Sequence, residues 1–534
     1  MTTASTSMAL ILAAATLAQP AAAGQGAAAR APLPVSPDRI DLRLEVRSEL
    51  PVVEVEADLT FQANEDLEAV ELFMGPNLTL EAVAGEDGVP LDYQRRRDRV
   101  RIATPALAAG DTVTWRFRYQ LRFPASLREA GQMFTALPWY PHFRHPPNAF
   151  EYTRYVPMRT RLTATLPRPW VLIAPGAGTT RNDGRNITYT WTDSVPAPAT
   201  ALVIGNLEQQ SRTHSSRLFR SFFPPGARSV SRPYAEYFAV AVTYFADNIG
   251  NLPRRNFSLV ALQLPEGISG LTVAGVTFLQ AGEIRPEQPF PYRILAHEIA
   301  HYWWNYHTEI PRRSDGWLRE GLPTYSALLF LEHQYGHAMM RQELERSRRV
   351  SLAVSSDEPL ALGFGMATTE AIYAFNYHKA ALVLHMLRQV IGSDGFAQLL
   401  RRLHELPAAL TRGAFVAEAE RIYGDDLSWF FASWLDSAAI PSFTVRYDSG
   451  VHEDESLSLF QLRGVIEQHG AAIRHPVLLR IPLDGAPPLE QRVWIEPGTT
   501  EFAITLPSRA RGLEFDPRGD LLYRSVTVEE RAPR

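Results

Sequence analysis

The stretch "ILAHEIAHYWW", Ile294–Trp304, decides the fold of the central region because it places two histidines four residues apart. On a helix, residues i and i+4 share one face, so the imidazoles of His297 and His301 can turn toward one ion, with Glu298 beside it. H-E-x-x-H is a zinc-binding pattern for this reason. The alternative is an exposed polar stripe, which fits poorly because apolar residues surround the histidines. A metal would compensate polar groups held in such surroundings.

A catalytic zinc ion needs a third protein ligand and keeps one coordination position open for water. The chain has no cysteine, which excludes thiolate ligands, disulfides, cysteine nucleophiles and a lipidated N-terminal cysteine. The third ligand must therefore be His, Asp or Glu. Glu320 lies near the start of an apolar helical segment, with eighteen residues between it and His301. On spacing alone, the competing candidates are His307, Glu309 and Asp315.

These segments resemble the aminopeptidase N family of gluzincin zinc metallopeptidases. That family has H-E-x-x-H, eighteen residues and then a glutamate within W-L-N-E-G-F-A-T-Y, where this chain has "WLREGLPTY" from Trp317 to Tyr325. The resemblance implies one zinc ion per chain, bound by His297, His301 and Glu320. It also implies that Glu298 is the general base. Three residues of the second motif depart from the family: Arg319 takes the place of Asn, and Leu322-Pro323 the place of Phe-Ala.

A second matching segment, "AFNYHKAALVLHML", resembles the family's Y-E-K-G-A-x-V-L-H-M-L helix. It aligns Tyr377 with the tyrosine that stabilises the oxyanion of the tetrahedral intermediate. The only lysine of the chain, Lys379, aligns with the motif's lysine. The alternative for Tyr377 is a core tyrosine on an apolar helix.

Asp315 aligns with the Asp of the family's D-L-W-L-N-E segment. There it would either orient a ligand histidine or be a solvated loop charge.

One departure concerns recognition of the substrate's amine. The family binds the free amine through the glutamate of G-x-M-E-N, upstream of the zinc helix. In the aligned stretch here, Gly270 keeps a glycine, whereas Leu271, Thr272 and Val273 replace Met, Glu and Asn. A neutral hydroxyl cannot pair with an ammonium as a carboxylate does, so we expect altered N-terminal recognition. Glu266, in "LPEGISG", is an alternative carboxylate for that place, or else a solvated turn residue.

The rest of the chain predicts a multidomain α+β protein. From Arg39 onward apolar and polar residues alternate, as in "VTWRFRYQLRF", which is typical of half-buried antiparallel strands. Helical periodicity follows, and alternation returns after Pro441. We therefore expect three domains: an N-terminal β-rich saddle or sandwich at 39–210, a thermolysin-like, mostly helical catalytic domain at 211–440, and a C-terminal β-sandwich at 441–534.

The N-terminal residues predict an exported protein. An apolar run, Met8–Leu17, precedes three alanines, which is the pattern of a signal peptide at 1–23, cleaved after Ala23 and followed by a linker at 24–38. The first seven residues contain no Lys or Arg, which favours the alternative of a disordered Ala-rich tail. No later segment has the roughly 20 apolar residues that a membrane-spanning helix needs. We expect a secreted or periplasmic location.

The net charge of −5 is too small to indicate binding to nucleic acid. The expected function is an exported zinc metallopeptidase that hydrolyses peptides through a metal-activated water. It would be aminopeptidase-like, with altered N-terminal recognition. The alternatives are a zinc endopeptidase or other amide hydrolase on the same fold, and a non-catalytic peptide-binding or scaffold protein. The sequence does not indicate an oligomeric state.

Overall fold

The computed structural model describes residues 33–46, 52–123, 131–136, 138–145, 151, 154–285, 288, 290–355, 358–454 and 457–531. The predicted signal peptide lies outside these residues, as does the predicted linker up to residue 32. The chain divides into two compact units. One comprises Met1–Asp247 and Asn251–His307, and the other comprises Asn248–Gly250 and Thr308–Arg534.

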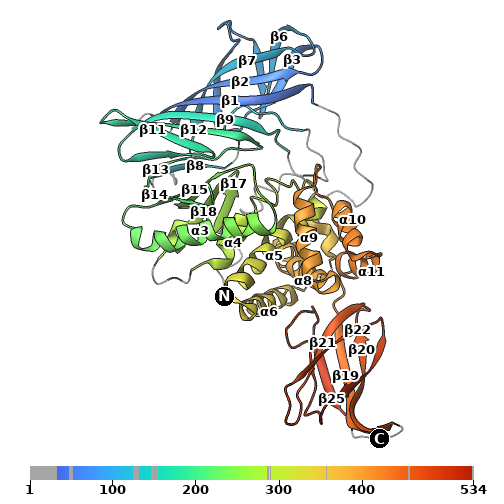
Figure 1. Ribbon diagram of the computed structural model, residues 1–534. Coiled ribbons are helices and arrows are strands. Elements are labelled where there is room, and N and C mark those ends of the chain that lie inside the picture. The colour runs from blue at the N-terminus through green and yellow to red at the C-terminus, as the bar shows by residue number, and fades with distance from the viewer. Residues whose placement is uncertain are drawn as a thin grey trace. The chain divides into compact units, whose positions relative to one another are not determined.

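The N-terminal part of the first unit is built on a seven-stranded sheet with the order β11-β12-β9-β1-β2-β7-β4 (Figure 1). The predicted alternation is confirmed in β7, where Trp115 and Phe117 are buried and the arginines beside them are exposed. The edge of the Trp115 ring contacts the ring of Phe61 on β2, with the centroids 4.9 Å apart. The strands are β1 (Val35–Val46), β2 (Val52–Ala63), β4 (Leu78–Ala84), β7 (Thr112–Arg122), β9 (Met158–Pro167), β11 (Ala177–Asn182) and β12 (Asn186–Ala197).

Two three-stranded sheets accompany this large sheet, with the orders β3-β6-β5 and β10-β13-β8. Both contribute buried side chains to the same apolar core as the seven-stranded sheet. Their strands are β3 (Leu67–Phe73), β5 (Tyr93–Arg96), β6 (Arg99–Leu107), β8 (Gln132–Thr135), β10 (Trp170–Ile173) and β13 (Leu202–Asn206).

A five-stranded sheet, order β14-β15-β16-β18-β17, supports helix α4 (Tyr292–Ala300), which packs against β17 and β18 (Figure 1). The sequence around Gly270 predicts an irregular segment, but the structure shows a hairpin there. Ala274 and Gly275 form its two-residue turn with φ of 42° and 95°, the positive values that favour tight hairpins. The remaining elements are β14 (Glu208–His214), β15 (Arg217–Phe223), α3 (Arg228–Asn248), β16 (Asn256–Leu262), β17 (Gly270–Val273) and β18 (Val276–Gln280).

The second unit begins with a group of helices. Helix α5 approaches α8 closely at Gly321, where an added Cβ would lie 2.7 Å from the Cβ of Ala380, so a glycine is required there. None of the helices that the structure describes is long and apolar enough to cross a membrane. The helices are α5 (Gly316–Tyr335), α6 (His337–Ala353), α7 (Thr369–Tyr373), a π-helical segment (Ala374–Lys379), α8 (Ala380–Ile391), α9 (Ser393–His404), α10 (Arg412–Tyr423), α11 (Ser428–Phe431) and a second π-helical segment (Ala432–Asp436).

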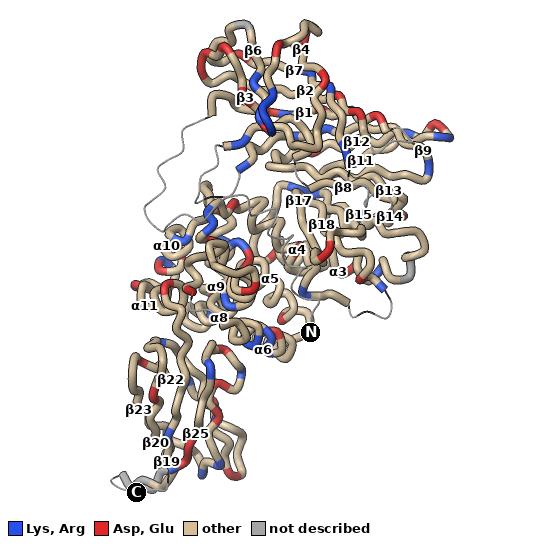
Figure 2. The backbone as a smooth tube through the Cα atoms, turned by 180° about the vertical axis from the view of Figure 1, so that it is seen from behind, with Lys and Arg blue, Asp and Glu red and all other residues tan. Residues whose placement is uncertain are grey.

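Two sheets, β23-β20-β19-β25 and β22-β21-β24, complete the second unit. Phe443 on β19 contacts Phe515 on β24, with ring centroids 5.1 Å apart, so the sheets share an aromatic core. Basic and acidic positions are interspersed along β19, β20 and β25 (Figure 2). The strands are β19 (Ser442–Asp454), β20 (Leu457–His469), β21 (His475–Ile481), β22 (Leu489–Ile495), β23 (Thr499–Leu506), β24 (Glu514–Phe515) and β25 (Val526–Glu530). The predicted α+β fold class is confirmed, with strands before and after the helices; the domain limits stay predictions.

A buried histidine at the start of β21 makes stability sensitive to acid. Neither ring nitrogen of His475 has a hydrogen-bond partner among the described residues, and burial lowers the pKa of this imidazole to about 3. The unfolded chain binds a proton near pH 6.5, so stability falls as the pH drops from 6.5 toward 3, by about 1.4 kcal/mol per pH unit. We expect His475→Phe to remove this one-proton dependence of the free energy of unfolding.

Urea unfolding between pH 4 and 7 measures the effect of His475→Phe. The matched control is His469→Gln, which removes a solvent-exposed imidazole from the neighbouring strand β20. The control should leave the pH dependence intact. An unchanged acid slope in His475→Phe would show that the buried ring is protonated in the folded protein.

Candidate metal centre

The two histidines of α4 face each other on one side of the helix. Their Nε2 atoms are 3.1 Å apart, and their ring planes are nearly perpendicular, at 88°. Two nitrogens that bind one tetrahedral zinc ion at about 2.0 Å are about 3.3 Å apart. Both rings therefore already have the spacing that a shared ion requires. His297 lies within α4, and His301 follows its last residue as the C-cap.

The structure brings Glu320 to the same place. One ligand atom from each of His297, His301 and Glu320 lies within 4.8 Å of the others, and this is the one such group of three among the described residues. Glu320 is on the second turn of α5 and is 8% exposed. Two imidazoles and one carboxylate match the ligand set of a catalytic zinc site.

The competing ligands lie elsewhere. Asp315 is buried, and its Oδ2 accepts a hydrogen bond from the backbone N–H of Arg412 at 3.3 Å. Burial raises its pKa, partly offset by that bond. Its carboxylate therefore stabilises the start of α10 rather than facing solvent. Among the described residues, neither Glu309 nor His307 belongs to the group of ligand atoms around the two histidines, and His307 lines a small cavity.

The segment after α4 supplies a residue that sequence reasoning missed. The side-chain amide of Asn305 lies 2.8 Å from Nδ1 of His301, and the backbone oxygen of Trp304 lies 3.4 Å from it. The backbone oxygen of Trp304 is the acceptor for the Nδ1–H, and a proton on Nδ1 leaves Nε2 free for a metal. Asn305 has a φ of 88°, a left-handed conformation that asparagine adopts more often than most other residues.

Glu298 lies against the edge strand β17. The residue is 9% exposed, and a Cβ added to Gly270 would lie 2.7 Å from its Cγ and 3.2 Å from its Oε1. Any larger residue at position 270 would displace the carboxylate. The absence of a side chain at Gly270 therefore allows β17 to lie this close to the Glu298 side chain.

Thr272 uses its side chain inside the protein. Its hydroxyl donates to the backbone oxygen of Glu298 at 2.8 Å and lies 3.2 Å from the hydroxyl of Thr277. That hydroxyl in turn lies 2.7 Å from the phenol of Tyr302, and burial raises the pKa of this phenol. These hydrogen bonds connect β17 and β18 to α4 and to Tyr302, which follows it. The two other candidates on this side differ: Leu271 is half-buried, and Glu266 is exposed in the turn before β17.

Tyr377 lies in the π-helical segment before α8. Its neighbours in this segment are buried, whereas Tyr377 retains partial exposure and packs against Tyr373 with ring centroids 5.3 Å apart. Single π-helical turns are frequent at functional sites because they turn one side chain out of the helical register. The ammonium of Lys379 is buried over the Phe375 ring, 5.2 Å from its centroid, and burial lowers its pKa to about 8.

Helix α5, which carries Glu320, is held from behind by a buried polar chain. The hydroxyl of Tyr325 lies 3.0 Å from Nδ1 of His385, and Nε2 of His385 lies 2.9 Å from Oδ1 of Asp520. Burial raises the pKa of Asp520, but hydrogen bonding and proximity to His385 outweigh it, so the net pKa is lowered. The ionised Asp520 accepts the Nε2–H, which leaves Nδ1 to accept from Tyr325. The segment between β24 and β25, which carries Asp520, therefore helps to fix the orientation of α5.

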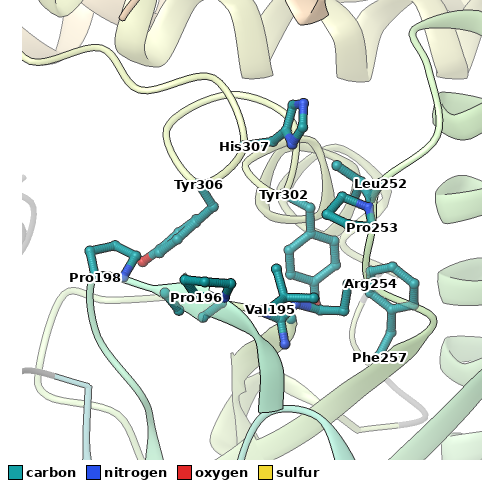
Figure 3. A pocket seen from close by; sticks show the side chains of 13 residues that line it. Val195, Pro196, Pro198, Leu252, Pro253, Arg254, Phe257, Tyr302, Tyr306 and His307 are labelled. Atoms are coloured by element: carbon teal, nitrogen blue, oxygen red, sulfur yellow. The ribbon is translucent and has the colours of Figure 1, made fainter. Parts of the chain in front are cut away.

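A small cavity lies beside the segment that follows α4 (Figure 3). Its volume of about 50 Å³ suits a few water molecules rather than a peptide substrate. Its walls include Pro196, Pro198 and Tyr306 (Figure 3). Arg254, which also lines it, forms a buried ion pair with Asp193 at 2.6 Å.

Two histidines on one face of a helix, a glutamate between them and a carboxylate from a second helix define a hydrolase of the metal-binding H-E-x-x-H class. Residues 288–434 match the model of the peptidase family M1 domain. This match confirms the predicted resemblance to the aminopeptidase N family. The chain is 23% identical over 302 residues to probable aminopeptidase 1 of Sulfurisphaera tokodaii. It is 24% identical over 242 residues to a membrane alanyl aminopeptidase of Manduca sexta.

These matches cover 53% and 40% of this chain, but only 38% and 22% of the two relatives. Among solved structures, the fold resembles the Legionella pneumophila aminopeptidase A in complex with aspartic acid. The TM-score is 0.69 at 18% identity, over 94% of this chain and 60% of that one. It also resembles an M1 zinc metallopeptidase of Deinococcus radiodurans bound to Tyr-Ser-Ala, with a TM-score of 0.59 at 23% identity, over 75% of this chain and 94% of that one.

Proposed function

We propose that this chain is an exported zinc-dependent peptidase of the aminopeptidase type that holds one zinc ion and has altered recognition of the substrate's N-terminus. The convergence of His297, His301 and Glu320 within 4.8 Å carries the proposal. The donor set of two imidazoles and one carboxylate fits zinc and leaves a coordination position for water. The apolar run followed by alanines at the N-terminus supports export.

Zinc, when bound, lowers the pKa of water and polarises a carbonyl group. Glu298 accepts the proton of the attacking water and passes it to the leaving amine. Gly270 gives Glu298 the room to stand beside the edge strand. The phenol of Tyr377 donates to the developing oxyanion, a role that suits its partial exposure in the π-helical segment.

The side chain of Thr272 supports altered recognition. A substrate ammonium needs a carboxylate partner, but this position carries a hydroxyl that is 4% exposed and donates to the Glu298 backbone. We expect an aminoacyl reporter and its N-acetylated twin to differ by less than about tenfold in kcat/KM, because one charged hydrogen bond, worth about 1.5–3 kcal/mol, is missing. Faster cleavage of long N-blocked peptides would favour the zinc endopeptidase or amide hydrolase alternative.

The Thr272→Glu variant tests the same position. Its carboxylate would be buried against the backbone oxygen of Glu298, two acceptors in contact. We expect no gain in preference for the free amine and a loss of about 1–3 kcal/mol in the free energy of unfolding. Thr272→Val, which keeps the shape, is the matched control and should keep the reporter ratio. A stable Thr272→Glu protein that prefers the free amine would contradict this assignment.

A further inference from the structure

Strand β17 is an edge strand of the sheet that the structure describes. It ends the order β14-β15-β16-β18-β17, and its hydrogen bonds to β18 alternate along the hairpin. Ser269 accepts from Gln280 at 3.0 Å, and Val273 and Val276 flank the turn. The odd-numbered residues of β17 therefore face β18, and the backbone groups of Gly270 and Thr272 point away from the sheet. An extended peptide can add to such an edge.

The scissile bond of such a peptide would lie at the level of Gly270. The Glu298 side chain stands next to this residue, so close that a Cβ on Gly270 would be 2.7 Å from its Cγ. The imidazole of the neighbouring His297 belongs to the candidate metal centre. The outward backbone groups of Gly270 are thus the ones nearest the chemistry.

Two residues further along, the edge is already occupied. The phenol of Tyr306 donates to the outward backbone oxygen of Thr272 at 2.6 Å. Its ring lines the small cavity, and its hydroxyl end points toward Pro198 (Figure 3). A peptide that extended along β17 from Gly270 toward Thr272 could not hydrogen-bond to the Thr272 backbone oxygen, because Tyr306 occupies it. Such a peptide would also clash with the Tyr306 ring.

We propose that Tyr306 is a specificity-determining residue that ends the peptide-binding edge on one side of the scissile bond. This inference rests on the proposed function. Gly270 and Thr272 are two residues apart, so the closed side holds about two residues of a strand that rises about 3.4 Å per residue. In aminopeptidase-type cleavage this is the amino side. The substrates are therefore peptides cut close to the N-terminus, selected by a closed edge rather than by a carboxylate that binds the amine.

The test uses the full zinc-loaded chain and a ladder of alanine peptides with one reporter bond. One, two, three or five residues precede that bond. We expect kcat/KM to fall at least about tenfold between two and three residues, the effect of a lost hydrogen bond and a clash. For the parent protein and for Tyr306→Ala, kcat/KM of the peptide with five residues before the bond is divided by that of the peptide with one. Tyr306→Ala should raise this ratio by at least about tenfold. Tyr306→Phe keeps the aromatic ring, so the fall in kcat/KM between two and three residues should remain.

Tyr335→Ala, which removes an exposed tyrosine at the end of α5, is the control and should leave the ladder unchanged. Equal kcat/KM along the ladder in the parent protein would overturn the proposal, as would an unchanged ratio in Tyr306→Ala. Binding of the same peptides to Glu298→Gln, measured by fluorescence anisotropy, gives a readout without turnover. Length-limited binding with no cleavage by the parent protein would uphold the closed edge while refuting the proposed peptidase function.

Discussion

The Glu298→Gln variant is expected to lose about 1,000-fold in kcat while still holding zinc. A positioned general base contributes about 10²–10⁴-fold to a rate, and glutamine cannot accept the proton. The amide has the shape of the carboxylate, so it fits the space beside Gly270 where an added Cβ would come within 2.7 Å of Cγ. The two ligand histidines and their 3.1 Å nitrogen spacing should be unchanged. Steady-state kinetics and metal analysis on one sample measure both quantities.

Glu266→Gln is the matched control for this substitution. It makes the same chemical change at an exposed turn residue just before β17. Glu266→Gln should have the kcat of the parent protein, whereas Glu298→Gln should not. If Glu298→Gln kept more than about a tenth of the parent activity, Glu298 could not be the general base, because a general base contributes at least about 100-fold to the rate.

The elements that the sequence predicts well have strong, local patterns. The two-residue alternation of β7 follows from one buried sheet face, and the spacing of His297 and His301 follows from the helical repeat. The β17–β18 hairpin was harder to predict, because its turn is Ala274-Gly275 rather than Asn-Gly. Alanine is uncommon at positive φ, so this turn carries a weak signal.

The contacts that define the candidate site are not local. Thr272 contacts the Glu298 backbone across 26 positions of the chain, and Tyr306 reaches the backbone of Thr272 across 34. Single-sequence patterns carry no information on such pairs, because periodicity describes one element at a time. The sequence shows only that threonine, Thr272, stands where the resembled family has its amine-binding glutamate. The closed edge becomes visible only when the hairpin and the end of α4 are placed together.

The Glu320→Gln variant is expected to weaken zinc binding by more than about 100-fold. Even residues that only orient a ligand change metal affinity by 10–100-fold, and this carboxylate is one of three groups whose ligand atoms lie within 4.8 Å of one another. A 100-fold weaker affinity removes about 2.7 kcal/mol of zinc-dependent stabilisation when the ion is in excess. Competition with a chromogenic chelator gives the affinity, and thermal unfolding with and without zinc gives the stabilisation.

Asp315→Asn and Glu309→Gln are the controls, because the sequence spacing alone allows either residue to be the third ligand. The carboxylate of Asp315 accepts from the backbone of Arg412 instead, so its loss should reduce stability but not zinc affinity. A fall in zinc affinity in a control variant, with none in Glu320→Gln, would move the third ligand away from α5.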